Sequence, residues 1–206
     1  MQPTKILPEG YSQAGILDLS SNRPVLIWLN IAGLGLFFLF GWIFLQILIM
    51  LRPLDVSEGL VVNLSNPVSI VLSCIVFILL NILMIILHEA AHGVFFWAFT
   101  RSCPEFAFRG LYAYAALPDW YLPRNMYLVT CLAPLVLISL AGILLLVFVP
   151  SKFFWSILVL MTLNASGAAG DFLVAAWLLL QPPTCLANDR GDAFSLFRFD
   201  TRGSTQ

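Results

Sequence analysis

The sequence predicts an all-α membrane protein with about four transmembrane helices and a small interfacial β-hairpin-like loop between the second and third spans. Composition is the first reason: 60% of the 206 residues are hydrophobic and only 10% are charged, whereas soluble domains carry about 25% charged residues. The second reason is four apolar runs, each long enough to cross the roughly 30 Å hydrocarbon core of a bilayer. They cover residues 24–51, 67–99, 126–149 and 153–180.

Polar segments flank these runs at both ends of the chain. Residues 1–23 lack the apolar core that a cleavable signal peptide needs. We expect them to form a short tail with an interfacial segment at residues 16–19. Residues 181–206 begin with proline and charged residues and predict a second polar tail. The whole of residues 1–206 is therefore expected to be a single membrane-embedded domain.

The first two apolar runs differ in length. Residues 24–51 carry no charge and end at Arg52, so they predict one simple span. Residues 67–99 exceed what a straight span needs, so this helix should tilt or extend beyond the bilayer. Small residues near its end, including Gly93, would let a neighbouring helix approach closely.

Residues 100–125 interrupt the apolar pattern with prolines and charged residues. Aromatic residues alternate with alanine on both sides of Arg109-Gly110. Alternation around a glycine-containing turn favours a small β-hairpin at the membrane surface. The alternative is an irregular interfacial loop that carries an aromatic belt.

The last two runs carry the remaining special features. Residues 126–149 contain Pro134, which should kink the third helix. Residues 153–180 predict one fourth span, rich in small residues around Asp171.

Lysine and arginine counts predict the orientation. With four spans, both termini and the 100–125 loop share one side, which holds eight of these residues. The other side holds two, Arg52 and Lys152. The positive-inside rule then places both termini in the cytoplasm.

The segment His88-Glu89-Ala90-Ala91-His92 contains both histidines of the chain. On a helix, positions i and i+4 lie on one face, so the two imidazoles can bind one metal ion. Imidazole nitrogen suits zinc, and Glu89 stands beside the first ligand, where it can act as general base. Ionisable residues inside an apolar helix are costly and mark functional sites. The alternative is a polar contact between helices.

Asp171 is the candidate third ligand. His88 and His92 precede Phe99 by eleven and seven residues, and Asp171 precedes Leu180 by nine. At about 1.5 Å per residue, all three lie roughly 10–17 Å from the cytoplasmic ends of their spans. Three ligands at one depth predict a His₂Asp zinc site with an open fourth position. The alternative is a neutral carboxyl group bonded to a neighbouring helix.

Asn164 precedes Asp171 by seven residues and shares its helical face. It could donate a hydrogen bond to a substrate backbone or to an oxyanion, or it could bond a neighbouring helix. Were Asp171 not the third ligand, the candidates would be Asp119, Asp189 and Asp192 in the polar segments.

These features together resemble the site-2 protease class of intramembrane zinc metalloproteases. The resemblance rests on the histidine motif in the second span, the hairpin-like loop, the Ala133-Pro134 pair and the Gly170-Asp171 pair. More closely, residues 65–195 resemble a bacterial and archaeal family of integral-membrane zincin peptidases related to that class. A prokaryotic cytoplasmic membrane is the location that this resemblance implies.

The resemblance implies that His88, His92 and Asp171 bind zinc and that Glu89 is the catalytic base. The chain departs from the class at its second motif. The class has a sequence like N-P-D-G or L-D-G, whereas Phe172 follows the aspartate here and no proline lies nearby.

The expected function is zinc-dependent intramembrane proteolysis. The expected partners are the lipid bilayer and a membrane-spanning or membrane-associated protein substrate, with no nucleic acid. The 100–125 hairpin could bind that substrate as an added strand. The alternatives are a non-peptidase membrane hydrolase, such as a lipid hydrolase, and a non-enzymatic protein that handles metal ions or protons.

Overall fold

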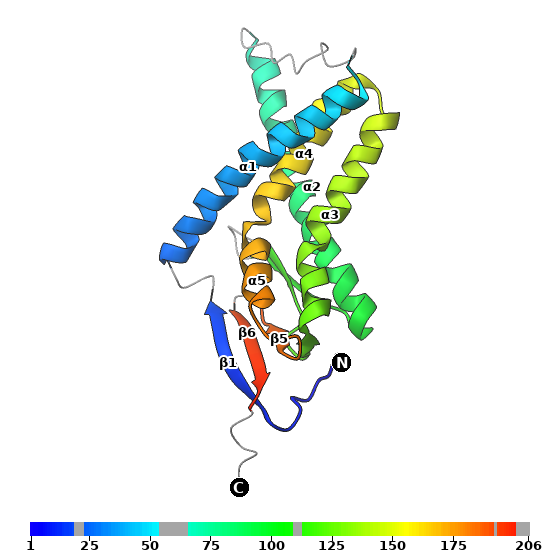
Figure 1. The fold of residues 1–206 in the computed structure, drawn as a ribbon. Coiled ribbons are helices and arrows are strands. Elements are labelled where there is room, and N and C mark those ends of the chain that lie inside the picture. The colour runs from blue at the N-terminus through cyan, green and yellow to red at the C-terminus, as the bar shows by residue number, and fades with distance from the viewer. Residues whose placement is uncertain (19–22, 54–65, 109–112, 192, 201–206) are drawn as a thin grey trace. The chain divides into compact units, whose positions relative to one another are not determined.

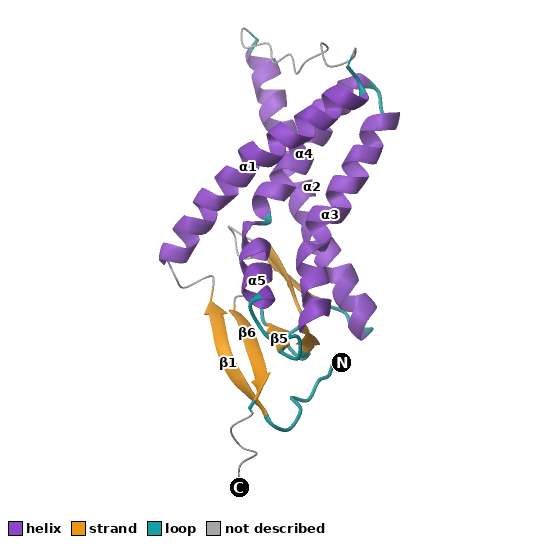
Figure 2. Ribbon diagram, in the orientation of Figure 1, coloured by secondary structure: helices purple, strands orange, loops and turns teal. Residues whose placement is uncertain are grey.

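The computed structural model describes residues 1–18, 23–53, 66–108, 113–191 and 193–200. The chain is mostly helical, with small antiparallel sheets (Figure 2). It divides into two compact units. One comprises residues 1–30, 89–133 and 170–206, and the other comprises residues 31–88 and 134–169.

Among the described residues, three helices are each long and apolar enough to cross a membrane, and a bent helix pair could form a fourth span (Figure 1). The three helices are α1 (Arg23–Leu51), α2 (Pro67–Thr100) and α3 (Arg124–Phe148). None of the residues in the most apolar window of α2 is buried among the described residues. Such unbroken apolar exposure suits a lipid environment and would be unstable in water.

The fourth predicted span is not one continuous helix. After the short 3₁₀ helix η1 (Ser151–Phe153), it consists of α4 (Phe154–Gly167) and α5 (Ala169–Leu179), bent by 44°. Ala168 caps α4 with ψ 7°, outside the helical range. The glycines on either side of Ala168 were expected only to let neighbouring helices pack closely. Glycine, however, also lowers helix propensity, and this makes a break inexpensive here.

Small residues hold α4 against α1 and α3 in the second unit. The Ser166 hydroxyl donates a hydrogen bond to the Gly33 carbonyl at 2.9 Å. A Cβ on Gly41 would lie 3.2 Å from the Thr162 methyl group, and one on Gly142 would lie 2.3 Å from the Met161 sulfur. These close approaches are the packing mode that small residues permit between apolar helices.

The chain is mostly helical, as predicted, but both tails also contain β-strands, which the prediction of an all-α chain with polar tails did not include. Strand β1 (Tyr11–Asp18) includes most of the segment expected to be interfacial. It pairs with β6 (Ala193–Phe199), which pairs with β5 (Leu186–Asp189), which pairs with β4 (Leu122–Pro123). The pairing joins residues about 180 positions apart, Tyr11 opposite Phe199. Such a distant partner is invisible in a local pattern.

The predicted hairpin is present. Strand β2 (Glu105–Phe108) pairs antiparallel with β3 (Ala113–Ala116). The Arg109-Gly110 turn lies outside the described residues. The pairing confirms the strand prediction, and the location of this hairpin at a membrane surface stays a prediction.

The first unit has one apolar core that connects helices and strands. It includes Phe96 of α2, Tyr127 and Cys131 of α3, Leu178 of α5 and Leu196 of β6. The core therefore fixes the end of α2, the start of α3 and α5 to the sheet that the two tails form.

Candidate metal centre

Two imidazoles stand one helical turn apart on α2. His88 is buried, with 8% of its surface exposed, and the His92 side chain is 12% exposed. Because both belong to one uninterrupted helix, their i, i+4 spacing points both rings to the same side. Glu89 follows His88 on the same helix and is partly exposed.

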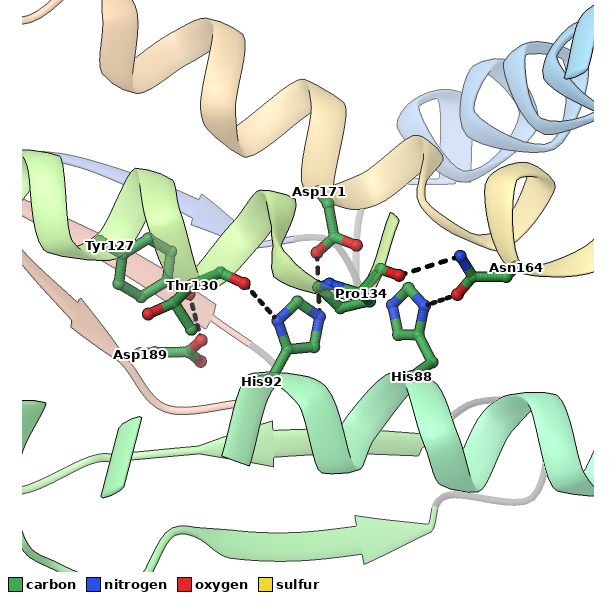
Figure 3. A network of polar contacts seen from close by, with 8 residues as sticks. All are labelled: His88, His92, Tyr127, Thr130, Pro134, Asn164, Asp171 and Asp189. Atoms are coloured by element: carbon green, nitrogen blue, oxygen red, sulfur yellow. Dashed lines mark hydrogen bonds and ion pairs between the residues drawn. The ribbon is translucent and has the colours of Figure 1, made fainter. Parts of the chain in front are cut away.

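The His92 ring contacts an oxygen atom on each side (Figure 3). Its Nδ1 lies 2.9 Å from the main-chain oxygen of Thr130. A carbonyl only accepts, so Nδ1 carries a proton and donates it. Its Nε2 lies 3.3 Å from Oδ1 of Asp171. With one ring proton committed to Thr130, either a second proton or a shared cation must lie between this nitrogen and the carboxylate.

Pro134 explains why the Thr130 carbonyl is available. In an α-helix this carbonyl would accept from the N–H four residues later. That residue is Pro134, which lies inside α3 and has no N–H. The sequence analysis expected only a kink from Pro134. The missing N–H also leaves an acceptor for His92.

His88 is oriented in a parallel way by Asn164 on α4. Its Nδ1 lies 3.0 Å from the Asn164 amide oxygen, and the Asn164 amide nitrogen donates to the Pro134 carbonyl at 3.2 Å. Because a carbonyl can only accept, the second bond fixes which end of the amide faces His88. His88 therefore donates through Nδ1, and its Nε2 is the atom left for a metal.

Asp171 reaches this region from the first turn of α5. The positive end of a helix dipole stabilises a carboxylate at that position. The break after α4 is what makes Asp171 an N-terminal residue. In one continuous helix it would sit in the helix interior without this stabilisation.

The structure brings His88, His92 and Asp171 together. Each offers one ligand atom, and these atoms all lie within 4.8 Å of one another. Ligands of a tetrahedral zinc ion are roughly 3.3–3.6 Å apart for bond lengths of about 2.0–2.2 Å. The 3.3 Å between His92 and Asp171 fits that geometry. Metal-binding histidines also usually donate their second N–H to an oxygen atom, and both histidines do so.

Asn164 does not face an open position for substrate. Its side chain is fully buried, and its amide bonds His88 and the Pro134 carbonyl. Of the two roles expected for it, the geometry favours the contact between helices.

The alternative third ligands are placed elsewhere or are not described. Asp119 lines a surface pocket with Lys5 and Tyr121. The Asp189 carboxylate accepts a hydrogen bond from the Tyr127 hydroxyl. Burial raises the pKa of Asp189, and the hydrogen bonds from Tyr127 and the Gly191 N–H oppose that rise. Asp192 lies outside the described residues.

Two features of the centre were missed in the sequence analysis. The Thr130 carbonyl is a main-chain group, so its residue type gives no signal. The orienting role of Asn164 toward His88 depends on how α4 packs. A proline four residues after a threonine, in a helix predicted to lie beside the histidines, was the available clue for the first.

Comparison with protein families identifies a match over half of the chain. A family model described as "Putative zincin peptidase" matches residues 81–186, which is 106 of the 206 residues. No curated protein and no solved structure matches the chain. The matched segment contains both histidines, Asn164 and Asp171. The chain therefore belongs to this family of zincin-like peptidases.

Proposed function

We propose that the protein is a zinc-dependent intramembrane metallopeptidase that hydrolyses peptide bonds of membrane-spanning or membrane-associated proteins. One observation carries the proposal. Both histidines donate through Nδ1 to fixed oxygen acceptors, and ligand atoms of the two rings converge with Asp171. The family match supports a peptidase.

Each residue of the centre has a distinct role in this proposal. His88, His92 and Asp171 would hold zinc, and Asn164 and the Thr130 carbonyl would keep the rings aligned. Zinc bound there would act as a Lewis acid, which makes water acidic enough to lose a proton near neutral pH. The Glu89 carboxylate would take a proton from the attacking water and deliver it to the departing amine nitrogen.

A membrane location follows from the composition of the helices. Three or four apolar helices qualify as spans, and the candidate ligands lie on two of them. Peptide bonds that reach this centre would therefore belong to polypeptides within or close to the bilayer. A helical substrate would have to unwind locally, and the edge of the β2–β3 hairpin offers main-chain groups for an extended segment.

The test combines metal analysis with cleavage. Purified wild-type protein should contain about one zinc per chain and cleave some members of a panel of single-span substrates. Glu89→Gln should keep its zinc and lose cleavage by a factor on the order of 10² or more, because the general base is gone. Glu9→Gln, at an exposed glutamate of the N-terminal segment, is the matched control and should cleave normally.

Different failures have different meanings. Equal cleavage by wild type and Glu89→Gln would rule out a catalytic role for Glu89. Zinc-dependent hydrolysis of lipid esters, with every peptide left intact, would replace the peptidase by a lipid hydrolase. A protein that binds zinc and hydrolyses neither class would favour a metal-handling role.

A further inference from the structure

A tyrosine–aspartate pair, in which the tyrosine is buried and the aspartate is partly buried, lies beside the metal centre and has no part in the proposed chemistry. Tyr127, near the start of α3, donates its hydroxyl proton to the Asp189 carboxylate at the end of β5 (Figure 3). Tyr127 is 5% exposed. A carboxylate that is partly removed from water is costly unless hydrogen bonds stabilise it, so the place of this pair needs an explanation.

Asp189 is held rigidly by the strands around it. Its Oδ1 accepts from the Gly191 N–H at 2.7 Å, and its carbonyl accepts from the Leu117 N–H at 3.2 Å. Gly191 has φ +83°, and a Cβ there would lie 2.2 Å from the Tyr114 ring. Only glycine fits this turn. The carboxylate therefore presents a fixed acceptor to Tyr127.

Tyr127 in turn contacts the helix that carries His92. Its ring centroid lies 6.0 Å from that of Phe96 on α2 and 4.8 Å from that of Phe194 on β6. Phe96 is four residues after His92, on the same face of α2. Tyr127 thus lies between α2 and the sheet. The hydrogen bond from its hydroxyl to Asp189 limits its movement.

The same stretch of α3 supplies the acceptor for His92. Thr130 is three residues after Tyr127, and its carbonyl accepts from His92 Nδ1 at 2.9 Å. Because Pro134 has no N–H, the Thr130 carbonyl lacks the main-chain hydrogen bond that it would normally accept within the helix. Its position relative to His92 must come from how the start of α3 is anchored.

We propose that Asp189 and Tyr127 are positioning residues for the metal centre. They anchor the start of α3 to the tail sheet, and thereby hold the Thr130 carbonyl where it sets the orientation of His92. This inference rests on the metal centre of the proposed function, but it does not require that the protein cleave peptides. It assigns the C-terminal strands a role in zinc binding.

The hydrogen bond and the packing can be separated by substitution. Tyr127→Phe keeps the ring between Phe96 and Phe194 and removes only the hydroxyl. Asp189→Ala removes the acceptor of the Tyr127 hydroxyl. Tyr121→Phe is the matched control, since Tyr121 packs edge-on against Phe197 in the same unit at 5.1 Å.

The experiment uses the full chain, purified in detergent, with two readouts that need no substrate. One is zinc affinity, measured by competition with a chromophoric chelator. The other is the visible absorption spectrum of the Co²⁺-substituted protein, which reports ligand geometry. Thermal unfolding of the metal-free protein checks that each variant is folded.

Tyr127→Phe and Asp189→Ala should bind zinc about 10-fold more weakly, the lower end of what loss of an orienting contact costs, and should share an altered Co²⁺ spectrum. Tyr121→Phe should match wild type in both readouts. If Asp189→Ala does not fold, Tyr127→Phe alone decides the question.

Two results would overturn the inference. One is a Tyr127→Phe protein with wild-type affinity and spectrum. The other is a Tyr121→Phe protein as defective as Tyr127→Phe, because the loss of any tyrosine hydroxyl in this unit would then have the same effect. A wild-type protein that binds neither metal would instead refute the metal centre of the proposed function.

Discussion

Asp171 is the residue on which the metal centre depends most. Its carboxylate lies 3.3 Å from His92 Nε2, and it reaches this point from the first turn of α5. The histidines alone would offer two ligands, fewer than the three that protein zinc sites with an open position use. The residue therefore decides whether the centre can hold zinc tightly.

Asp171→Ala should weaken zinc binding by at least about 100-fold, more than loss of an orienting contact costs, since a direct ligand is removed. Titration of the purified protein with zinc measures this. Asp119→Ala, at a surface pocket, should bind as wild type does. Tight zinc binding by Asp171→Ala would show that another residue is the third ligand.

The side-chain amide of Asn164 forms hydrogen bonds to two other helices. It accepts from His88 and donates to the Pro134 carbonyl. Asn164→Leu keeps a similar volume but leaves the buried His88 N–H without this acceptor, which typically costs about 1–3 kcal/mol. We expect a lower unfolding temperature and zinc affinity reduced about 10–100-fold.

Asn30→Leu is the control for this change, because the Asn30 amide bonds the Leu26 carbonyl within its own helix. It should leave zinc affinity unchanged. The account of Asn164 fails if the two variants bind zinc equally well.

At the scale of elements, α3 contains an irregularity, an interior proline, that bears on the metal centre. An interior proline costs a helix about 3 kcal/mol, yet Pro134 leaves the Thr130 carbonyl available to His92. Pro134→Ala restores the N–H that competes for this carbonyl. The variant should be at least as stable as wild type without metal, and should bind zinc about 10-fold more weakly, as expected when an orienting acceptor is lost.

Calorimetry of the metal-free protein and a zinc titration would measure the two effects separately. Pro150→Ala, at the N-cap of η1, supplies the comparison and should not change zinc affinity. Unchanged affinity in Pro134→Ala would mean that the carbonyl does not orient His92.

At this scale, part of the candidate site could be predicted because helix geometry is fixed. A constant rise per residue predicts that His88, His92 and Asp171 lie at one depth, and their ligand atoms lie within 4.8 Å of one another. The break at Ala168 and the hydrogen bond from His92 to Thr130 could not be predicted from the sequence, for a different reason. Both depend on main-chain conformation and on packing between helices, which side-chain type alone does not encode.

At the scale of the whole molecule, the tails belong to the structure that supports the centre. Strand order β1-β6-β5-β4 joins the N-terminal segment, the C-terminal segment and the 122–123 segment in one sheet. These are the three segments that the lysine and arginine counts assign to one side of the membrane. The sheet was not predicted, because its strands are short and pair across almost the full length of the chain.

An even number of spans follows if the tails meet in one sheet on one side. Reporter fusions at residue 60 and after the C-terminus should then lie on opposite sides of the membrane, with the C-terminal reporter in the cytoplasm. Accessibility of each reporter in intact cells measures this. Reporters on the same side would exclude the four-span arrangement.

The central claim is that one zinc ion is held by two imidazoles and a carboxylate. X-ray absorption at the zinc edge of the purified protein tests it most directly. The account predicts only nitrogen and oxygen neighbours, at about 2.0–2.2 Å, with the scattering pattern of two imidazole rings. A sulfur neighbour at about 2.3 Å would bring a cysteine into the site, and a single imidazole would remove one of the two histidines; either result would contradict the centre as described.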